Sequence, residues 1–157
     1  MNRLIQIANN AKALNEKKIF ITVISKKGIN TFIADLNRGQ LLAGEGADNN
    51  NLMRYIDDPF FKSKEQALAY QRWKEKISPN GEKPKDVMDF YINGYFHKSI
   101  YTKINDDYFS LRSDVDFAKD IIKKEKDALG LNKTSLNELI KEILPIFIEE
   151  TRQLLLK

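Results

Sequence analysis

The sequence lacks cysteine altogether and contains a single histidine, His97. Without cysteine the chain can form no disulfide, use no thiolate nucleophile and ligate no metal through sulfur. One histidine alone does not supply a typical zinc site, which combines several histidines or cysteines. We therefore expect the protein to mature in a reducing cytosol, and any histidine-dependent catalysis would have to use His97.

Long hydrophobic runs are missing as well. No stretch approaches the roughly 20 apolar residues that span a bilayer, so we expect no membrane segment. The start, from Met1 to Gln6, carries no long apolar segment ahead of a small-residue cleavage site, so we expect no secretory signal. A chain of 157 residues fits one domain of ordinary size, and we predict a single domain over residues 1–157.

The balance of charge is only mildly basic. The chain has 26 lysines and arginines against 22 aspartates and glutamates, a net charge of +4. The basic pairs Lys17–Lys18, Lys26–Lys27 and Lys123–Lys124 are scattered and have acidic residues between them. This mixture is typical of solvated faces, since net charge bears on solubility more than on the choice of partner. A basic nucleic-acid-binding accessory protein is the alternative function that the charge leaves open.

Most of the chain shows apolar residues at the steps of three and four that indicate amphipathic helices. The pattern predicts helices over residues 2–16, 29–42, 64–77, 115–126 and 135–157. In the helix over 64–77 the apolar stripe is Ala67, Tyr70, Trp73 and Ile77. The β-branched run Ile19–Ile24 favours a buried strand when taken alone, but a helix is the other interpretation.

One β-hairpin and two loops complete the predicted elements. Residues 94–104 alternate in polarity, a turn signal follows at 105–107, and residues 108–112 form the returning strand, so we predict a hairpin over about 94–112. Clusters of turn residues predict exposed loops over about 43–52 and 78–85. The predicted fold class is α+β, with several helices packed with a small antiparallel sheet and a long kinked C-terminal helix.

The last helix is the most informative element. Ser135 and Glu138 have the spacing of a capping box, which predicts a helix start at Ser135 and a length of about 33 Å. Pro145 lies inside this helix, so we expect a kink near residues 140–142. Its apolar residues cover a wide arc, which indicates packing on more than one side. The helix is therefore either a central core helix or one shared between the core and a neighbouring chain.

No constellation of residues indicates catalysis. The adjacent carboxylates Asp57–Asp58, Asp106–Asp107 and Glu149–Glu150 point in different directions on a helix or strand and do not converge by themselves. His97 lies in the predicted strand, on the face opposite Phe96, and is expected to be exposed or hydrogen-bonded. We predict no catalytic, cofactor-binding or metal site and no enzymatic activity; a nuclease assembled from distant acids is the remaining enzymatic interpretation.

Three segments together carry a resemblance to a known family. Residues 33–44 read IADLNRGQLLAG and run into a glycine loop, residues 89–100 combine an aromatic segment with the predicted hairpin start, and residues 130–132 read GLN just before the last helix. In these features and in the order of its elements over residues 19–157, the sequence resembles small virion proteins of tailed bacteriophages that infect gut Bacteroidales. The resemblance favours a helix over residues 19–24.

The resemblance implies a structural protein of the phage neck: a head–tail connector, adaptor or tail-completion subunit. Such a protein forms a closed ring of its own copies, about 12 beside the portal or about 6 at the tail terminus, through heterologous contacts. The ring joins the portal and head to other neck and tail proteins and helps to retain packaged DNA, with non-specific contact to its phosphates. The implied location is the virion neck or tail, and the host cytoplasm during assembly.

Candidate interface residues come from the motif, the aromatic segment and the last helix. Arg38 and Gln40 match the family motif, where a role as loop anchors explains them as well as an interface does. Aromatic residues of segment 90–109 suit a core margin or a partner contact. The candidates are Arg38, Gln40, Tyr91, Tyr95, Phe147, Ile148, Leu154 and Leu155.

Overall fold

The structure is a computed structural model that describes residues 3–79 and 85–157, residue 27 by its backbone alone. The elements in chain order are α1 (Arg3–Lys12), α2 (Glu16–Ile24), α3 (Lys27–Leu42), the 3-10 turn η1 (Tyr55–Asp57), α4 (Lys64–Ile77), α5 (Tyr95–Ser99), β1 (Ile100–Ile104), β2 (Phe109–Ser113), α6 (Ala118–Lys124) and α7 (Lys133–Leu156). The two strands form one antiparallel sheet. The α+β prediction is therefore confirmed.

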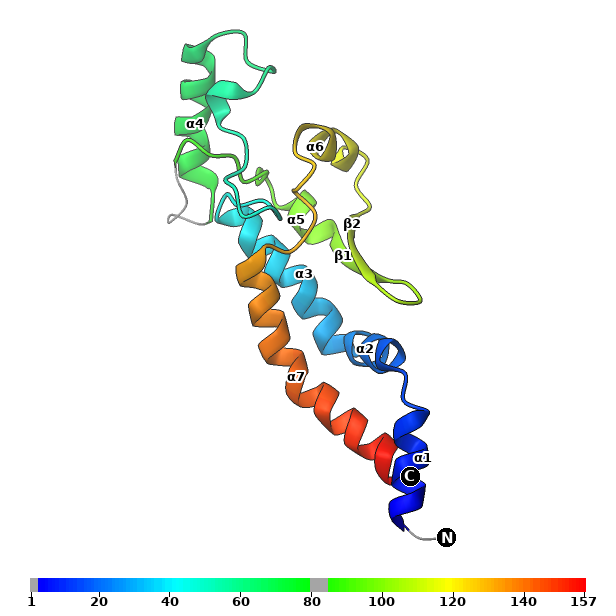
Figure 1. Ribbon diagram of the computed structural model, residues 1–157. Coiled ribbons are helices and arrows are strands. Elements are labelled where there is room, and N and C mark those ends of the chain that lie inside the picture. Colours follow the sequence, from blue (N-terminus) through cyan, green and yellow to red (C-terminus); the bar gives the residue numbers. More distant parts are fainter. Residues whose placement is uncertain (1–2, 80–84) are drawn as a thin grey trace.

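The molecule is elongated, and α3 and α7 lie side by side along its middle (Figure 1). Helix α2 packs against both of them, and α1 lies against the C-terminal part of α7. Helices α4 and α6 lie at the opposite end of the molecule, beyond the hairpin. The long helix α7 thus connects the α4–α6 end with the end at which α1 and the C-terminus meet.

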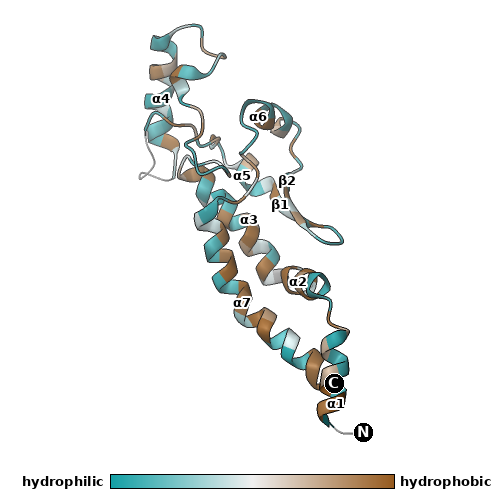
Figure 2. Cartoon of the chain, in the orientation of Figure 1, coloured by the Kyte–Doolittle hydropathy of each residue, from teal (hydrophilic) through white to brown (hydrophobic). Residues whose placement is uncertain are grey.

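The buried apolar residues form three clusters along this axis. The first lies between α2, α3 and α7 and contains Val23, Ile24, Ile29, Ile33, Leu139 and Ile143. The second joins the end of α3 to β1 and α6, and the third surrounds η1 and α4. Figure 2 shows apolar residues recurring between polar ones along α3 and α7, as expected of helices that bury one side.

The run from Ile19 to Ile24 is helical, so the strand interpretation is wrong. Asn15 caps this helix, because its side-chain oxygen accepts a hydrogen bond from the Lys18 backbone N–H at 3.0 Å. Ile19 and Val23, four residues apart, are both buried. Packing of this side against α7 outweighs the weak preference of β-branched residues for strands.

The hairpin is shorter than predicted. Strand β1 pairs with β2 from Ile100 opposite Ser113 to Ile104 opposite Phe109. Residues 95–99 of the predicted strand instead form the helical turn α5. Gly94 precedes this turn with φ +78°, a left-handed conformation that glycine adopts without strain and that breaks an extended strand. The alternating pattern is correct only from Ile100, where Ile100 and Thr102 are buried against α3.

Two predicted helix starts also need correction. Helix α6 begins at Ala118 rather than at residue 115, after Phe117, which makes no side-chain capping bond. Helix α7 begins at Lys133, and its cap is Asn132 rather than Ser135. The Asn132 side-chain oxygen accepts a hydrogen bond from the Ser135 backbone N–H at 2.9 Å. From there α7 continues as a helix through Pro145 to Leu156.

The predicted exposed loop over residues 43–52 is exposed at residues 48–51 and packed on either side of them. Gly44 and Gly46 are buried, and Leu52 is 2% exposed. The Ala47 N–H donates to the Asp127 carbonyl at 2.8 Å, and the Asn49 side chain accepts from the Lys133 N–H at 2.8 Å. The turn is therefore held against the start of α7. Most of the other predicted loop, residues 80–84, lies outside the described residues.

Helix α1 contains no buried residue and depends on α7 for its position. The Gln6 side chain donates to the Lys157 carbonyl at 2.8 Å, and the Asn10 side chain donates to the Leu155 carbonyl at 3.1 Å. Carbonyls in the last turn of a helix have no partner within the helix. The side chains of α1 therefore satisfy carbonyl groups at the end of α7.

The first testable prediction concerns Gly44, whose φ of +74° disfavours other residues and whose added Cβ would lie 2.8 Å from Val87 Cγ1. We expect Gly44→Ala to lower the free energy of unfolding by about 1–3 kcal/mol through strain and steric overlap. Gly39→Ala is the matched control, because nothing lies within 4 Å of its added Cβ and alanine favours the helix interior by about 1 kcal/mol. Urea denaturation should give shifts of opposite sign, and equal shifts would contradict this account.

Candidate functional site

Gln40 and its neighbours determine where α7 starts. Gln40 is 5% exposed, and its side-chain nitrogen donates to the Gly130 carbonyl at 3.0 Å. Its side-chain oxygen accepts from the Asn132 backbone N–H at 2.8 Å and from the Ser135 hydroxyl at 3.3 Å. Gln40 therefore anchors the start of α7 within its own chain, one of the two roles that the sequence leaves open.

Arg38 performs a similar task on the other side of α3. Its guanidinium donates to the backbone carbonyls of His97 and Ile100 and pairs with Asp35. These contacts join α3 to the transition from α5 to β1. Of the two roles that the sequence leaves open, loop anchoring is the one that the structure supports for both Arg38 and Gln40.

Helix α7 carries a row of exposed aliphatic side chains, here called the aliphatic ridge. Its members are Leu136 (41% exposed), Ile140 (53%), Leu144 (50%) and Ile148 (50%). They follow one another at steps of four residues, so they are neighbours on the helix surface. The buried side of the same helix is marked by Leu139 and Ile143. The apolar arc of α7 is thus wider than its own core covers.

The remaining candidates on α7 divide between these two sides. Ile148 belongs to the ridge, and Leu154 is also exposed. Phe147 is half-buried and packs on the α2–α3–α7 core, and Leu155 is half-buried as well. Exposed Leu4 and Ile5 of α1 lie at the same end of the molecule as Leu154. A further group of exposed aliphatic side chains therefore lies at the end where α1 meets α7.

The charged neighbours of the ridge are basic. Lys133 and Lys141 lie three residues before Leu136 and Leu144, and Arg152 lies four residues after Ile148. No glutamate of α7 lies three or four residues from a ridge member. Because only such spacings bring side chains together on a helix surface, the ridge is bordered by positive charge.

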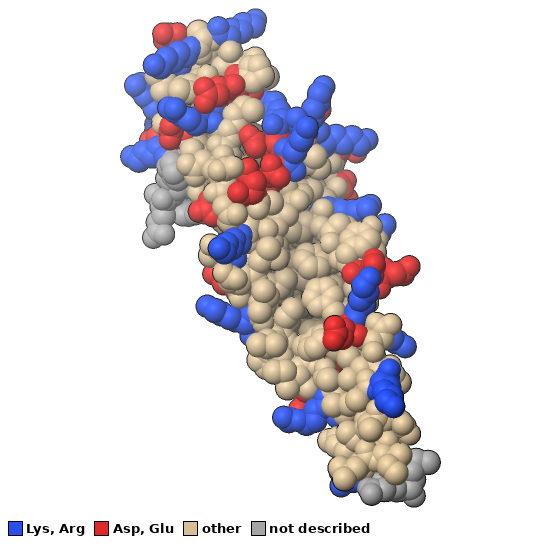
Figure 3. All heavy atoms as spheres, viewed as in Figure 1, with Lys and Arg blue, Asp and Glu red and all other residues tan. Residues whose placement is uncertain are grey.

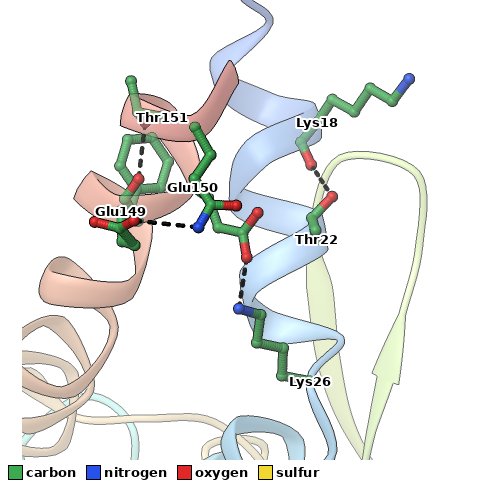
Figure 4. Close-up of polar contacts among 8 residues, drawn as sticks. Lys18, Thr22, Lys26, Glu149, Glu150 and Thr151 are labelled. Atoms are coloured by element: carbon green, nitrogen blue, oxygen red, sulfur yellow. Dashed lines mark hydrogen bonds and ion pairs between the residues drawn. The ribbon is translucent and has the colours of Figure 1, made fainter. Parts of the chain in front are cut away.

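Glutamates of α7 face other partners. Glu150 pairs with Lys26 at 2.6 Å and joins α7 to the turn between α2 and α3 (Figure 4). Glu149 instead lies beside Arg152 and accepts from Gln153. The two adjacent carboxylates therefore diverge, as the sequence predicts. In the part of the chain that the structure describes, no three residues of the metal-binding types cluster.

The second candidate surface is a pocket of about 520 Å³ between α4, α6 and residues 88–96. Seven of its 15 lining residues are aromatic, and we call it the aromatic pocket. The wall rings are Tyr55, Phe61, Tyr70, Phe90 and Phe96. Three further lining residues are apolar and exposed and border the mouth, namely Phe60, Ile92 and Phe117. A volume of this size falls within the range of ordinary binding sites, roughly 300–1,000 Å³.

Two carboxylates lie in this lining and differ in their partners. Asp58 is 6% exposed, and its two oxygens accept from Lys124 Nζ at 3.0 and 3.1 Å. The same ammonium lies 5.5 Å from the centre of the Phe60 ring. Asp120 is exposed and, within the described residues, forms no ion pair. The pocket therefore offers one uncompensated negative charge beside an apolar wall.

A buried ion pair supports the inner side of the pocket. Lys74 Nζ lies 2.7 Å from an Asp89 oxygen, and the side chains are 3% and 0% exposed. Asp89 also accepts from the Ser78 hydroxyl at 2.7 Å and from the Tyr91 N–H at 2.9 Å. Burial raises the pKa of Asp89, but the bonds from Lys74, Ser78 and Tyr91 outweigh burial and hold this pKa below its ordinary value. The carboxylate stays charged and fixes α4 to segment 85–91.

His97 is buried within α5 and does not lie on a strand. Its Nε2 lies 2.7 Å from the Asp89 carbonyl oxygen, so Nε2 carries the proton and donates. Nδ1 makes no hydrogen bond within the described chain. Burial lowers the pKa of His97, and the positive charges of Lys74 and Arg38 lower it further, against the opposing effect of Asp89. The ring is a neutral packing group against Tyr91.

The two tyrosine candidates differ in exposure. Tyr91 is half-buried, with its ring centre 5.4 Å from that of His97. Tyr95 is 62% exposed and begins α5. Tyr95 is therefore available to a partner, whereas Tyr91 is mainly a packing residue. The structure brings neither of them together with the aliphatic ridge, which lies on α7.

The sequence analysis missed the aromatic pocket and its buried lysine. Trp73 was assigned to the apolar stripe of α4, but it is 44% exposed, and Lys74 occupies the buried position. The steps from Ala67 to Tyr70 to Lys74 to Ile77 are three, four and three, which fit one helix face. A lysine inside such a stripe is the signal that indicates a buried ion pair. For the pocket, the adjacent Phe60 and Phe61 after a turn were the only hint.

No family model, curated protein or solved structure with which the chain was compared matches it. Among the helices formed by the described residues, none combines the length and apolar character that crossing a membrane requires.

A second prediction tests the ion pair. Lys74→Met leaves the Asp89 charge buried without its cation, so the free energy of unfolding should fall by about 3–5 kcal/mol. Lys74→Met with Asp89→Asn removes the charge but keeps acceptor and donor groups for Ser78 and Tyr91, and it should recover most of that loss. Lys76→Met, an exposed position of the same helix, is the control and should change stability by less than about 0.5 kcal/mol. Chemical denaturation measures all three, and a double variant as unstable as the single one would refute the charge argument.

A third prediction follows from the lowered pKa of His97. The unfolded chain gains a proton on this residue as pH falls through about 6.5, the ordinary pKa, whereas the folded chain gains it only at lower pH. Protonation therefore favours unfolding, and stability should decrease as pH falls from 6.5 toward the folded pKa. Because His97 is the only histidine, His97→Gln should remove most of this slope. Urea midpoints between about pH 7.5 and pH 5.5 measure it, and parallel slopes in the two proteins would contradict the prediction.

Proposed function

We propose that this chain is a structural subunit of the neck of a tailed bacteriophage, assembling into a ring that joins the portal to the tail and helps to retain packaged DNA. The resemblance of residues 33–44, 89–100 and 130–132 to small phage virion proteins suggests this identity. The structural observation that carries the proposal is the aliphatic ridge of α7. A subunit that works through contacts between copies needs apolar surface that its own fold leaves uncovered.

The ridge fits this requirement in extent and in rigidity. Its four side chains span about 18 Å along the helix at 1.5 Å per residue, and soluble monomers rarely expose contiguous apolar surface of large size. Covering the exposed half of each side chain would contribute on the order of 1 kcal/mol per residue. Because Leu139 and Ile143 fix the other side of α7 in the core, the ridge is presented without a folding cost.

The alternative function, nucleic-acid binding, has less support in the arrangement of charge. On the face drawn in Figure 3, lysines and arginines are interspersed with aspartates and glutamates toward the α4–α6 end, and the middle carries mostly uncharged side chains. A surface that follows a phosphate backbone would show a continuous basic stripe. The ring proposal still allows weak contact with DNA in the lumen, which salt would abolish.

The fourth prediction tests assembly through the ridge. Leu144→Glu places a charge in the centre of the ridge, where an interface would bury it, and should abolish oligomers while leaving the thermal unfolding transition nearly unchanged. Thr134→Glu is the control, because Thr134 is exposed on the same helix and lies three or four residues from no ridge member. Sedimentation velocity gives the oligomeric state, and electron microscopy of the purified protein and of its parent particle shows whether rings form between portal and tail.

Two results would overturn the proposed function. One is a protein that stays monomeric at high concentration and is absent from the neck of the particle. The other is tight DNA or RNA binding with a steep salt dependence and no assembly, which would favour the nucleic-acid alternative.

A further inference from the structure

We propose that the aliphatic ridge of one copy docks into the aromatic pocket of the next copy. The inference rests on the proposed ring, and it identifies the second of the two surfaces that meet between neighbouring subunits. A closed ring requires a heterologous contact, in which each subunit presents two different patches that complement one another. The ridge supplies one patch, and the pocket has the properties of the other.

Seven of the 16 exposed large hydrophobic residues in the described chain lie in the ridge or at the mouth of the pocket. Half of the exposed large hydrophobic residues lie on α1 and α7, and the ridge is their continuous part. Phe60, Ile92 and Phe117 form a second group around the mouth of the aromatic pocket. Phe60 is 75% exposed, an unusual exposure for a phenylalanine that no partner covers. Both groups therefore expose apolar surface that a second copy would cover.

Their shapes are complementary. The ridge is convex, because its aliphatic side chains project from a straight row on one helix. The pocket is a hollow of about 520 Å³ with aromatic walls. The two patches lie on different elements, the ridge along α7 and the pocket between α4 and α6 at one end of the molecule (Figure 1). One copy therefore presents both patches at once, as a member of a ring must.

Their charges are complementary as well. Lys133 and Lys141 border the ridge, and no acid of α7 lies beside it. The pocket lining contains Asp120, which forms no ion pair within the described chain, while Lys124 is already paired with Asp58. Docking would bring a basic border against a free carboxylate. A ridge packed against a second ridge would instead bring lysines together, which costs free energy.

The fifth prediction uses the absence of cysteine from the chain. We mix two single-cysteine variants, Leu144→Cys in the ridge and Phe117→Cys at the pocket mouth, and treat the mixture with a short bifunctional maleimide. The proposal predicts a covalent dimer that joins residue 144 of one copy to residue 117 of the other. Ile92→Cys repeats the test at a second site of the mouth. Tyr108→Cys, exposed at the hairpin turn outside both patches, is the control and should not be linked to residue 144.

Charge reversal provides an independent measurement. Asp120→Lys should weaken assembly at least tenfold in sedimentation experiments, and Lys141→Asp in the same chain should restore part of it. Asp116→Lys, an exposed position outside the pocket lining, should have little effect. Recovery of assembly in the double variant would show that positions 120 and 141 interact. A loss of stability in either single variant would not produce this recovery.

The possible outcomes distinguish failure of this docking inference from failure of the proposed ring. Dimers linked from residue 144 to residue 144 alone would show that the ridge pairs with itself, and this inference would fall. Rings seen by microscopy without any link from residue 144 to residues 92 or 117 would also overturn it, while the proposed ring would stand. Absence of assembly at every concentration would remove both.

Discussion

The position of α7 depends on a buried amide contact at the end of α3. Gln40 accepts from the backbone N–H of Asn132, the cap of α7, and from the Ser135 hydroxyl in the first turn of α7, and it donates to the Gly130 carbonyl. Asn37 donates to the carbonyls of Ala128 and Gly130. Each bond stabilises the fold by only about 1 kcal/mol net, but losing a partner in a buried place costs about 1–3 kcal/mol. The main effect of the contact is therefore to fix the direction of α7, and its net contribution to stability is smaller. With another direction, a different side of α7 would face the core.

The ridge is a consequence of that geometry. Helices α2 and α3 lie against one side of α7, and the sheet is too small to cover the other. Leu139 and Ile143 are thus buried, whereas Ile140 and Leu144, one position further round the helix, are exposed. The two-stranded sheet does not extend between α4 and α6. Aromatic side chains line the pocket that lies between these two helices. Both candidate surfaces follow from a small core in an elongated molecule.

The sequence predicts a structural element well where neighbouring residues in the chain determine it, and poorly where contacts with distant segments determine it. Periodicity predicts α3 and α4 closely, because each buries residues at helical steps of three and four, even though one of those in α4 is Lys74. It fails at Ile19–Ile24, where contact with α7 decides between helix and strand, and at residues 95–99, where Gly94 allows a turn that an alternating pattern conceals. The contact with α7 cannot be read from residues near Ile19–Ile24, whereas Gly94 is a local signal that the alternating pattern outweighs.

The candidate site was predictable to a similar degree. The wide apolar arc of α7 indicates a helix with more apolar surface than its own core covers, and Ile148 and Leu154 are indeed exposed. Gln40 was grouped with them because a motif does not distinguish a residue that holds its own chain from one that contacts another. The aromatic pocket combines residues from four separate segments, and such convergence becomes visible only in three dimensions. Lys74 is the exception, because its place in the stripe of α4 can be read from the spacing.

The docking of α1 on the end of α7 has a consequence for how the protein is made. A ribosome synthesises α1 well before α7, yet α7 is the main packing partner of α1 and supplies the carbonyls to which Gln6 and Asn10 bind. A helix of ten residues with nothing buried is marginal in water on its own. α1 therefore gains its main stabilising contacts only once α7 has been synthesised, so its docking is a late step in folding.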